Sequence, residues 1–455
     1  MTLDDLLATG DGWPLLLTQD GPVWRGDAVA AARRAAGGLA ARGIGPGDVV
    51  AVDAAPSPEF VALLLGAALR GATLLPVATS MPAATRARVE SHAGARLSLA
   101  ASAFLGLQAE AAEPAGASDA GDASAAAFHP AAAIAVATSG STGLPRVVRI
   151  PWTAAVASAR HGAVAVPFGP GDTWHASLSA AHVGGLMILV RAIALGGAAC
   201  IAPAPRTWAD LAGITHVSVV AAQLARLLED AADPPASLKA VLLGGGPSAQ
   251  ALRDAALARG LPLFVTYGLT ETCSQVATGR LAAGEPATLA GPPIAPTRVW
   301  AEADELLIDG PTLADAELRD GAAVTLARPL RTRDHGFLDA QGRVHVVGRH
   351  DAMFISGGKN IHPEAIERAL GEIPGVRAAC VVGVPDARWG MRPVAFVDLL
   401  HAPPQPLRDA LAARLERHLI PDAIFAMPPD EAAKMKPSRA ALAARLAAGE
   451  PFDQR

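Results

Sequence analysis

Helix-like and strand-like segments alternate along the first hundred residues of the chain. Apolar residues recur at helical spacing over 27–42 and 60–70, and a short apolar run follows each of these segments, over 49–53 and 72–77. Strands and helices that alternate at this pitch form βαβ units, in which the strands run parallel and helices cover the faces of the sheet. The chain is therefore predicted to be an α/β protein built on a mostly parallel sheet.

The alternation breaks at a low-complexity stretch and changes character near residue 300. Residues 108–130 are rich in small and acidic residues without any period, and we interpret them as a surface linker. Three later apolar runs, over 215–221, 239–243 and 263–266, are predicted strands. Beyond residue 301 short strands and turns predominate, and a compact series of helices and strands follows residue 348.

The length of the chain predicts more than one domain. At 455 residues it exceeds the size of a single compact core, because domains usually hold about 100–200 residues. The change in pattern after residue 348 predicts an N-terminal domain over 1–348, a boundary over 349–351 and a smaller C-terminal domain over 352–455.

Charge, hydropathy and cysteine spacing exclude several classes of protein. The net charge of −5 argues against a nucleic-acid binder held by a basic surface. The longest apolar stretches lie on either side of Arg191 and are shorter than the roughly 20 residues that a membrane span needs. The N-terminus does not resemble a signal peptide, and Cys200, Cys273 and Cys380 are too widely spaced for a zinc or disulfide scaffold. We expect a cytoplasmic protein without a membrane span.

A loop rich in glycine and hydroxyl groups follows the predicted strand over 131–137. Its glycines let the backbone approach a ligand, and its N–H and hydroxyl groups suit phosphate oxygens. The spacing differs from a Walker P-loop, and the alternative is a solvated polar turn. The candidate phosphate-binding residues are Thr138, Ser139, Gly140, Ser141, Thr142, Gly143 and Arg146.

A second candidate segment surrounds Tyr267, which is the only tyrosine of the chain. Its ring follows a predicted strand and precedes Gly268, where it could stack on a planar base. Glu271 carries a carboxylate of the kind that Mg²⁺ prefers. The alternative is a core aromatic residue beside a surface acid. The turn Gly244-Gly245-Gly246 also follows a strand and allows close approach of a ligand.

Three further segments carry charges or glycines in suggestive positions. Asp334 and Arg349 could together hold the hydroxyl groups of a ribose, although each is also common as a turn residue or a solvated charge. Gly357 and Gly358 form a turn before a predicted helix that begins at Pro363. The last segment, Lys-Met-Lys-Pro-Ser-Arg over 434–439, places two lysines near the C-terminus.

In this order and at these separations, the five segments resemble the acyl-adenylate-forming superfamily of acid–thiol ligases, luciferases and adenylation domains. The resemblance extends from the N-terminal helices and strands to Leu442. It implies an α/β fold with a large N-terminal domain of layered sheets and a small β-subdomain, followed by a mobile small α+β domain. It also implies that a carboxylate attacks the α-phosphate of ATP, and that a thiol then displaces AMP.

The resemblance assigns a role to each candidate residue. Residues 138–146 correspond to the loop that holds the β- and γ-phosphates, and Lys436 to the adenylating lysine of a K-x-x-R-x-x-L pattern, whereas Lys434 matches only its charge. The remaining implied contacts are Tyr267 and Gly268 with adenine beside Gly244, Gly245 and Gly246, Thr270 with the α-phosphate, Glu271 with Mg²⁺, Asp334 and Arg349 with the ribose, and Asp351 as the hinge.

Two positions depart from the family pattern. The phosphate loop of the family usually ends in lysine, and here Arg146 takes that place. Arginine keeps the positive charge and adds bidentate phosphate recognition, so we expect activity to survive. Met435 replaces the usual glycine before the catalytic lysine, which weakens the assignment of Lys436.

The substrates are predicted from finer similarities. The stretch that contains Gly357 and Gly358 is similar to that of CoA-ligating members, where these glycines let the pantetheine arm pass. Residues 178–191 and 214–228 are most similar to o-succinylbenzoate–CoA ligases, and His182 corresponds to a residue beside the acyl pocket, although a packed histidine at a helix start is equally compatible. We expect an aryl or short acyl carboxylate as substrate, with ATP, Mg²⁺ and CoA.

Alternatives remain at this point. The acceptor could be the phosphopantetheine of an acyl carrier protein in a polyketide-like pathway. The departures at Arg146 and Met435 also fit a non-catalytic AMP-binding paralogue, although Glu271, Asp334 and Lys436 are retained. The partners expected are small molecules or a carrier protein, without nucleic acid, and a homodimer is allowed.

Overall fold

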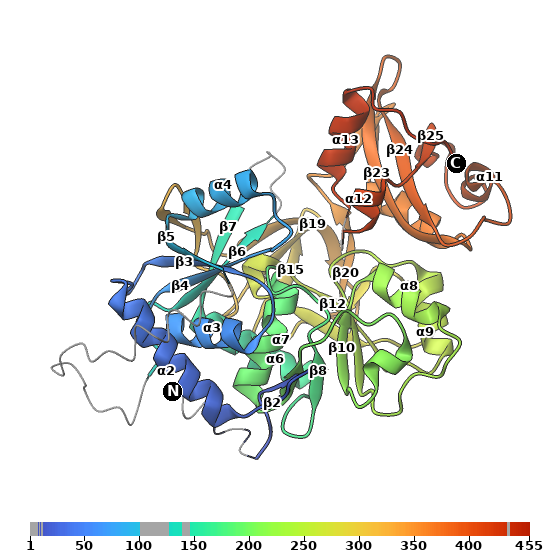
Figure 1. The fold of residues 1–455 in the computed structure, drawn as a ribbon. Helices are drawn as coiled ribbons and strands as arrows, with labels where there is room; N and C mark the ends of the chain where they lie inside the picture. The colour runs from blue at the N-terminus through green and yellow to red at the C-terminus, as the bar shows by residue number, and fades with distance from the viewer. Residues whose placement is uncertain (1–7, 9, 11, 101–126, 139–145, 435–436) are drawn as a thin grey trace.

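The computed structural model describes residues 8, 10, 12–100, 127–138, 146–434 and 437–455 (Figure 1). Two large sheets form its N-terminal part. The seven-stranded sheet has the order β18-β17-β7-β6-β4-β3-β5 and the eight-stranded sheet the order β13-β12-β11-β10-β8-β9-β1-β2. The first sheet consists of β3 (Val49–Asp53), β4 (Thr73–Val77), β5 (Ala95–Leu99), β6 (Ala133–Thr138), β7 (Arg146–Pro151), β17 (Ala316–Arg319) and β18 (Ala322–Thr325). The second consists of β1 (Leu16–Thr18), β2 (Gly21–Val23), β8 (Thr173–His175), β9 (Ala198–Cys200), β10 (His216–Val219), β11 (Ala240–Leu243), β12 (Leu263–Tyr267) and β13 (Ala277–Arg280).

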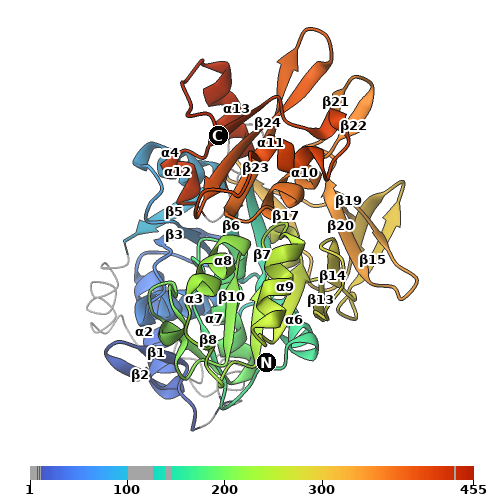
Figure 2. The same ribbon diagram turned by 90° about the vertical axis from the view of Figure 1, so that its right-hand side faces the viewer.

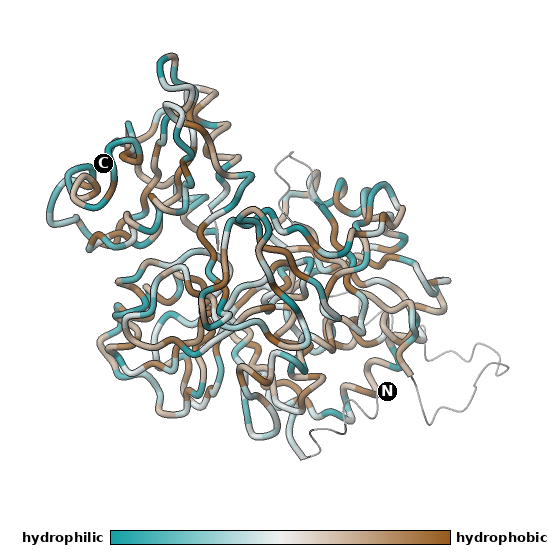
Figure 3. Tube along the Cα trace, turned by 180° about the vertical axis from the view of Figure 1, so that it is seen from behind, coloured by the Kyte–Doolittle hydropathy of each residue, from teal (hydrophilic) through white to brown (hydrophobic). Residues whose placement is uncertain are grey.

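Helices lie between and outside the two sheets. The inner helices, whose side chains fill the largest hydrophobic core, are α2 (Arg25–Ala41), α3 (Pro58–Arg70), α6 (Trp152–Ala165) and α7 (Val183–Leu195). The outer helices are α4 (Ala83–Ala93) on the first sheet, and α8 (Ala221–Glu229) and α9 (Gln250–Ala258) on the second (Figure 2). Apolar segments accordingly run through the interior, with hydrophilic loops at the surface (Figure 3). The layered α/β fold predicted from the sequence is confirmed.

A five-stranded sheet, in the order β14-β20-β19-β16-β15, forms a small β-subdomain next to the second large sheet. Its core contacts Tyr267, the last residue of β12, and Leu269, which follows that strand. The strands are β14 (Leu289–Gly291), β15 (Arg298–Glu302), β16 (Glu305–Asp309), β19 (Leu330–Leu338) and β20 (Val344–Arg349).

The C-terminal domain follows β20 as a separate unit (Figure 1), and its elements β23 and α10 touch α8 and α9 of the N-terminal part. One core lies under α10 and α11 and a second under α12 and α13, on either side of its sheet. Its elements are β21 (Phe354–Ser356), β22 (Lys359–Ile361), α10 (Pro363–Gly371), β23 (Val376–Asp386), β24 (Gly390–Leu399), α11 (Leu407–Ala412), β25 (Ala423–Ala426), α12 (Pro429–Ala432) and α13 (Arg439–Ala447). Among the residues described, no helix combines the length and apolar character that crossing a bilayer requires.

Local chemistry explains where several elements begin and end. Helix α3 begins where the Ser57 hydroxyl accepts a hydrogen bond from the Phe60 N–H, and it ends at Gly71, whose φ is 70°. The strand over 49–53 matches its prediction, whereas β12 extends one residue further than predicted and includes Tyr267. Most of the linker predicted over 108–130 lies outside the described residues.

Three histidines meet where the two domains join. The ring centroids of His335 on β19 and His362 at the start of α10 lie 4.8 Å apart, and those of His335 and His350 lie 5.5 Å apart. Arg368 on α10 donates a hydrogen bond from Nη1 to the Val347 carbonyl at 2.9 Å, which joins α10 to β20. Burial and the neighbouring His335 lower the pKa of His362, since the opposing attraction of Glu364 does not compensate for them.

The junction should therefore weaken in acid. The docked arrangement favours neutral His362, so its contribution is complete above the ordinary histidine pKa of about 6.5 and is lost as the pH falls below that value. We expect the thermal unfolding midpoint to fall less between pH 7.5 and 5.5 in His362→Gln than in the wild type. His401→Gln, which changes an exposed histidine of the same domain, is the control. Parallel profiles for the wild type and His362→Gln would contradict this prediction.

Candidate active site

The carboxyl ends of four parallel strands lie at one edge of the eight-stranded sheet. Strands β8, β10, β11 and β12 run parallel as neighbours. The segment that contains His182 follows β8, the Gly244–Gly246 turn follows β11, and Gly268 follows β12. Ligands of open α/β sheets bind at this edge, so the topology brings the predicted residues of these three segments to one region. His182 itself is exposed and immediately precedes α7.

Tyr267 is connected to both residues that were predicted to hold a ribose. Its hydroxyl donates to Asp334 Oδ2 at 2.5 Å, and Arg349 Nη1 donates to Asp334 Oδ1 at 3.0 Å. Asp334 and Arg349 are paired directly across β19 and β20. Arg349 also binds both carboxylate oxygens of Asp351, at 2.7 and 2.8 Å. The chain of contacts thus extends from the edge of β12 to the predicted hinge.

This network shifts the ionisation of its members. Burial, together with the negative charge of Asp334, raises the pKa of the Tyr267 phenol well above its ordinary value, so the phenol stays protonated as a donor. The Arg349 guanidinium holds the pKa of Asp351 below its usual range, and its own pKa is raised chiefly by the hydrogen bonds to Asp351. Arg349 and Asp351 therefore remain ionised at neutral pH.

Two glycines are required by backbone packing at this edge. A Cβ on Gly268 would lie 1.3 Å from the Ser274 carbonyl oxygen, and one on Gly244 would lie 2.6 Å from Thr266 Cγ2. The turn after Gly268 is tight, since Cys273 and Ser274 both adopt positive φ, at 55° and 82°. A Cβ on Gly246 meets no atom within 4 Å, so that glycine is not demanded by packing.

Arg146 bridges two carboxylates beside the predicted phosphate loop. Its Nη1 lies 3.1 Å from Glu271 Oε1, and its Nε lies 3.0 Å from Glu317 Oε2. Thr138 and Arg146 are the paired ends of strands β6 and β7. The residues between them, Ser139, Gly140, Ser141, Thr142 and Gly143, lie outside the described residues. Thr270 and Glu271 belong to a short 3-10 turn over Thr270–Thr272.

The predicted site residues of the C-terminal domain are not part of the network around Tyr267. Gly357 and Gly358 form the turn between β21 and β22, both with positive φ, and a Cβ on Gly357 would lie 2.8 Å from the Trp389 ring. No hydrogen bond or ion pair of the described residues joins this turn to Tyr267 or Glu271. Lys434 forms an ion pair with the buried Glu431, and Lys436 is outside the described residues.

In the sequence, Arg191 was noted only as the residue that interrupts an apolar stretch, and the environment of its side chain was not predicted. Its side chain is buried on α7, lies 5.0 Å from the Trp174 ring centroid and donates to Gln275 Oε1 at 2.5 Å. Burial lowers its pKa to about 10, so it is still charged at neutral pH. Within the described part of the chain no carboxylate pairs with it. A lone cation within the apolar helix 183–195 was the available signal.

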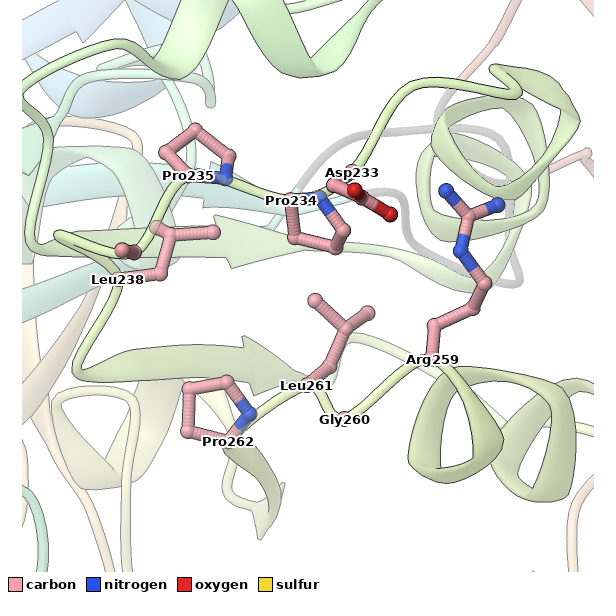
Figure 4. Close-up of a pocket in the computed structure, with 9 residues that line it drawn as sticks. Asp233, Pro234, Pro235, Leu238, Arg259, Gly260, Leu261 and Pro262 are labelled. Atoms are coloured by element: carbon pink, nitrogen blue, oxygen red, sulfur yellow. The ribbon is translucent and has the colours of Figure 1, made fainter.

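A surface hollow elsewhere is not part of this site. It is lined by Asp233, Pro234, Pro235, Ala236, Leu238, Arg259, Gly260, Leu261 and Pro262 (Figure 4). These residues precede β11 and β12, so the hollow lies at the amino ends of the strands, opposite the edge that carries Tyr267. Arg259 is held there by the carbonyls of Asp230 and Ala232.

Comparison with known proteins gives matches over most of the chain. A family model described as AMP-binding enzyme matches residues 26–305, and one described as AMP-binding enzyme C-terminal domain matches 365–432. A 2-succinylbenzoate–CoA ligase from Salmonella typhimurium is 34% identical over 370 residues, which cover 80% of this chain and 79% of that protein. A protein of the same name from Bacillus cereus is 35% identical over 285 residues, which cover 57% of this chain and 58% of its own length.

Solved structures match the fold throughout. The o-succinylbenzoate CoA synthetase (MenE) from Bacillus subtilis, in complex with the acyl-adenylate intermediate OSB-AMP, superposes with a TM-score of 0.82 at 26% identity and covers 98% of this chain and 97% of its own. The same enzyme in complex with ATP and magnesium ion superposes with a TM-score of 0.80 at 26% identity, covering 93% and 95%.

The packing at Gly268 predicts a large loss of stability on substitution. In Gly268→Ala the new methyl group cannot coexist with the Ser274 carbonyl, so the turn must move. We expect the free energy of unfolding to fall by about 3 kcal/mol or more, measured by urea denaturation. Gly246→Ala, where the methyl group has space, should change it by less than about 1 kcal/mol. If the free energy of unfolding fell equally in the two variants, the close contact with the Ser274 carbonyl would not be the reason that position 268 requires glycine.

Proposed function

The chain belongs to the family of AMP-binding enzymes, and from this membership we propose that it is an AMP-forming ligase that joins 2-succinylbenzoate to CoA. The observation that carries the proposal is the Tyr267–Asp334–Arg349 network at the carboxyl edge of β12. Glu271, which follows Tyr267 closely in the sequence, forms the ion pair with Arg146. The aromatic ring of Tyr267 can stack on a base, and the buried carboxylate of Asp334 can accept hydrogen bonds from a ribose. Glu271 and Arg146 together suit a metal-bound triphosphate.

The reaction has two steps. In the first, a carboxylate oxygen of the acid attacks the α-phosphorus of ATP, and the bond from that phosphorus to pyrophosphate breaks. In the second, the thiol of CoA attacks the acyl carbon and loses its proton, and AMP leaves as its C–O bond breaks. Both reactants of the first step are anions, so cations must be placed where charge accumulates on phosphorus.

Residues of both domains share the work of binding and orientation. Tyr267 stacks on adenine beside the Gly244–Gly246 turn, and Asp334 with Arg349 binds the ribose hydroxyls. Residues 138–143 and Arg146 hold the outer phosphates, Thr270 contacts the α-phosphate, and Lys436 approaches from the C-terminal domain. Gly357 and Gly358 leave space for the pantetheine arm when that domain turns about Asp351.

The Glu271 carboxylate fits a bound Mg²⁺. Among the described residues its carboxylate forms an ion pair with Arg146 alone, and its side chain is 14% exposed, so it keeps some access to solvent. Hard divalent cations prefer carboxylate and phosphate oxygens. Glu271 would hold the ion, and the charge of the bound ion would neutralise the triphosphate.

Arg191 supports the choice of a dicarboxylic substrate. 2-Succinylbenzoate carries one carboxylate that is activated and a second that remains anionic. A buried guanidinium without a carboxylate partner in the described residues can receive that second group, and burial makes such a pair specific. The three cysteines are free thiols, which is consistent with the cytoplasmic location that we propose.

Removal of the adenylating lysine tests the reaction itself. The wild type should exchange pyrophosphate with ATP when 2-succinylbenzoate is present, and should transfer the acyl group to CoA in preference to a phosphopantetheinylated carrier protein. Lys436→Ala should reduce exchange by about 100-fold or more, because the charge at phosphorus is lost. Lys434→Gln is the matched control, since Lys434 is already bound to Glu431, and it should stay within about threefold. If Lys436→Ala still exchanged pyrophosphate with ATP at the wild-type rate, Lys436 would not be the adenylating lysine.

Replacement of Arg191 tests the substrate. Arg191→Gln should raise the KM for 2-succinylbenzoate by about 100-fold, because a buried anion loses its counter-ion. The matched substrate is 4-oxo-4-phenylbutanoate, which lacks the ring carboxylate, and its KM should change by less than about threefold. A similar increase for both acids would indicate that Arg191 serves only the packing of α7.

A further inference from the structure

We propose that Glu317 is a positioning residue that holds the Arg146 guanidinium in the orientation that binds the outer phosphates of the nucleotide. This inference rests on the proposed function. Glu317 lies on β17, directly opposite Val148 of the neighbouring strand β7. Its carboxylate is 5% exposed and accepts a hydrogen bond from Arg146 Nε at 3.0 Å.

A buried carboxylate at this place is unexpected on electrostatic grounds. It lies beside the loop expected to hold a triphosphate, where a second anion would repel the ligand. Arg319 neutralises Glu317 from one side, with hydrogen bonds of 2.9 and 3.0 Å to its two oxygens. The two arginines together hold the pKa of Glu317 below its usual range, so the group is an anion that binds Arg146 and not a neutral acid. Glu317 is therefore a charged, buried acceptor that can orient Arg146.

Two different nitrogens of the Arg146 guanidinium contact the two carboxylates. Nε contacts Glu317, whereas Nη1 contacts Glu271 at 3.1 Å. If Glu271 held a Mg²⁺ ion, Arg146 would no longer be needed to neutralise that carboxylate, and its Nε contact with Glu317 would remain. Arg146, which is 43% exposed, then presents its terminal nitrogens to phosphate oxygens while its orientation is kept. A lysine has a single ammonium group and cannot make both contacts and keep this orientation.

Nucleotide binding measured by calorimetry tests the proposal without relying on turnover. In Glu317→Gln, which keeps the size of the side chain, the dissociation constant for ATP with Mg²⁺ should rise by about tenfold, because Arg146 is no longer fixed. The dissociation constant for AMP should change by less than about twofold, since AMP lacks the outer phosphates. Asp309→Asn, which removes a carboxylate paired with Arg298 on the β-subdomain, should change neither value.

A double-mutant cycle separates positioning from a general loss of structure. In the Arg146→Lys background, Glu317→Gln should change the affinity for ATP by less than about twofold, because the two residues act as a unit. Equal weakening in both backgrounds, equal weakening of ATP and AMP, or unchanged ATP affinity would each overturn the role of Glu317. A wild type that binds neither nucleotide would instead overturn the proposed function, so the two failures are distinguishable.

Discussion

The hydrogen-bonded chain from Tyr267 through Asp334 to Arg349 fixes the geometry of the candidate site. Its members come from β12 of one sheet and from β19 and β20 of another, so the chain locks the β-subdomain against the large sheet. Asp334 is buried, and a buried carboxylate is tolerated because both of its oxygens are bound. Since Arg349 also binds Asp351, the same interaction defines the point from which the C-terminal domain extends.

The charges around this site are nearly balanced without a ligand. Four carboxylates, on Glu271, Glu317, Asp334 and Asp351, are bound by three arginines, Arg146, Arg319 and Arg349. Four negative and three positive charges leave a net charge of −1. A site of this kind accepts a divalent cation together with a polyanion more readily than either ion separately.

Motif residues and their layout could be predicted from the sequence because each lies in a short segment next to a strand end. The carboxyl end of β12, the residues Asp334 and Arg349, and the alternation of helices and strands followed from local patterns, whereas the layered sheets and the β-subdomain followed from the family resemblance. The pairs that join distant segments could not be predicted. Arg191 meets Gln275 across 84 residues, and Arg146 meets Glu317 across 171, so the contacts depend on how helices and sheets pack. Helix α11 likewise ends at Ala412 although Leu415 and Leu419 beyond it pack on the same core, so apolar spacing alone does not give the end of this helix.

The position of Arg191 has a consequence for how such an enzyme could diverge. The residue is on α7, which packs between the two large sheets, and not on a surface loop. Exchanging loops at the rim would therefore leave the contact that we propose between Arg191 and a second carboxylate intact. A descendant that accepts neutral acids would have to replace a charged group within the hydrophobic interior and find a new donor for Gln275 in the same step. A substrate preference set by a buried helix residue changes less readily through single substitutions than one set by surface loops.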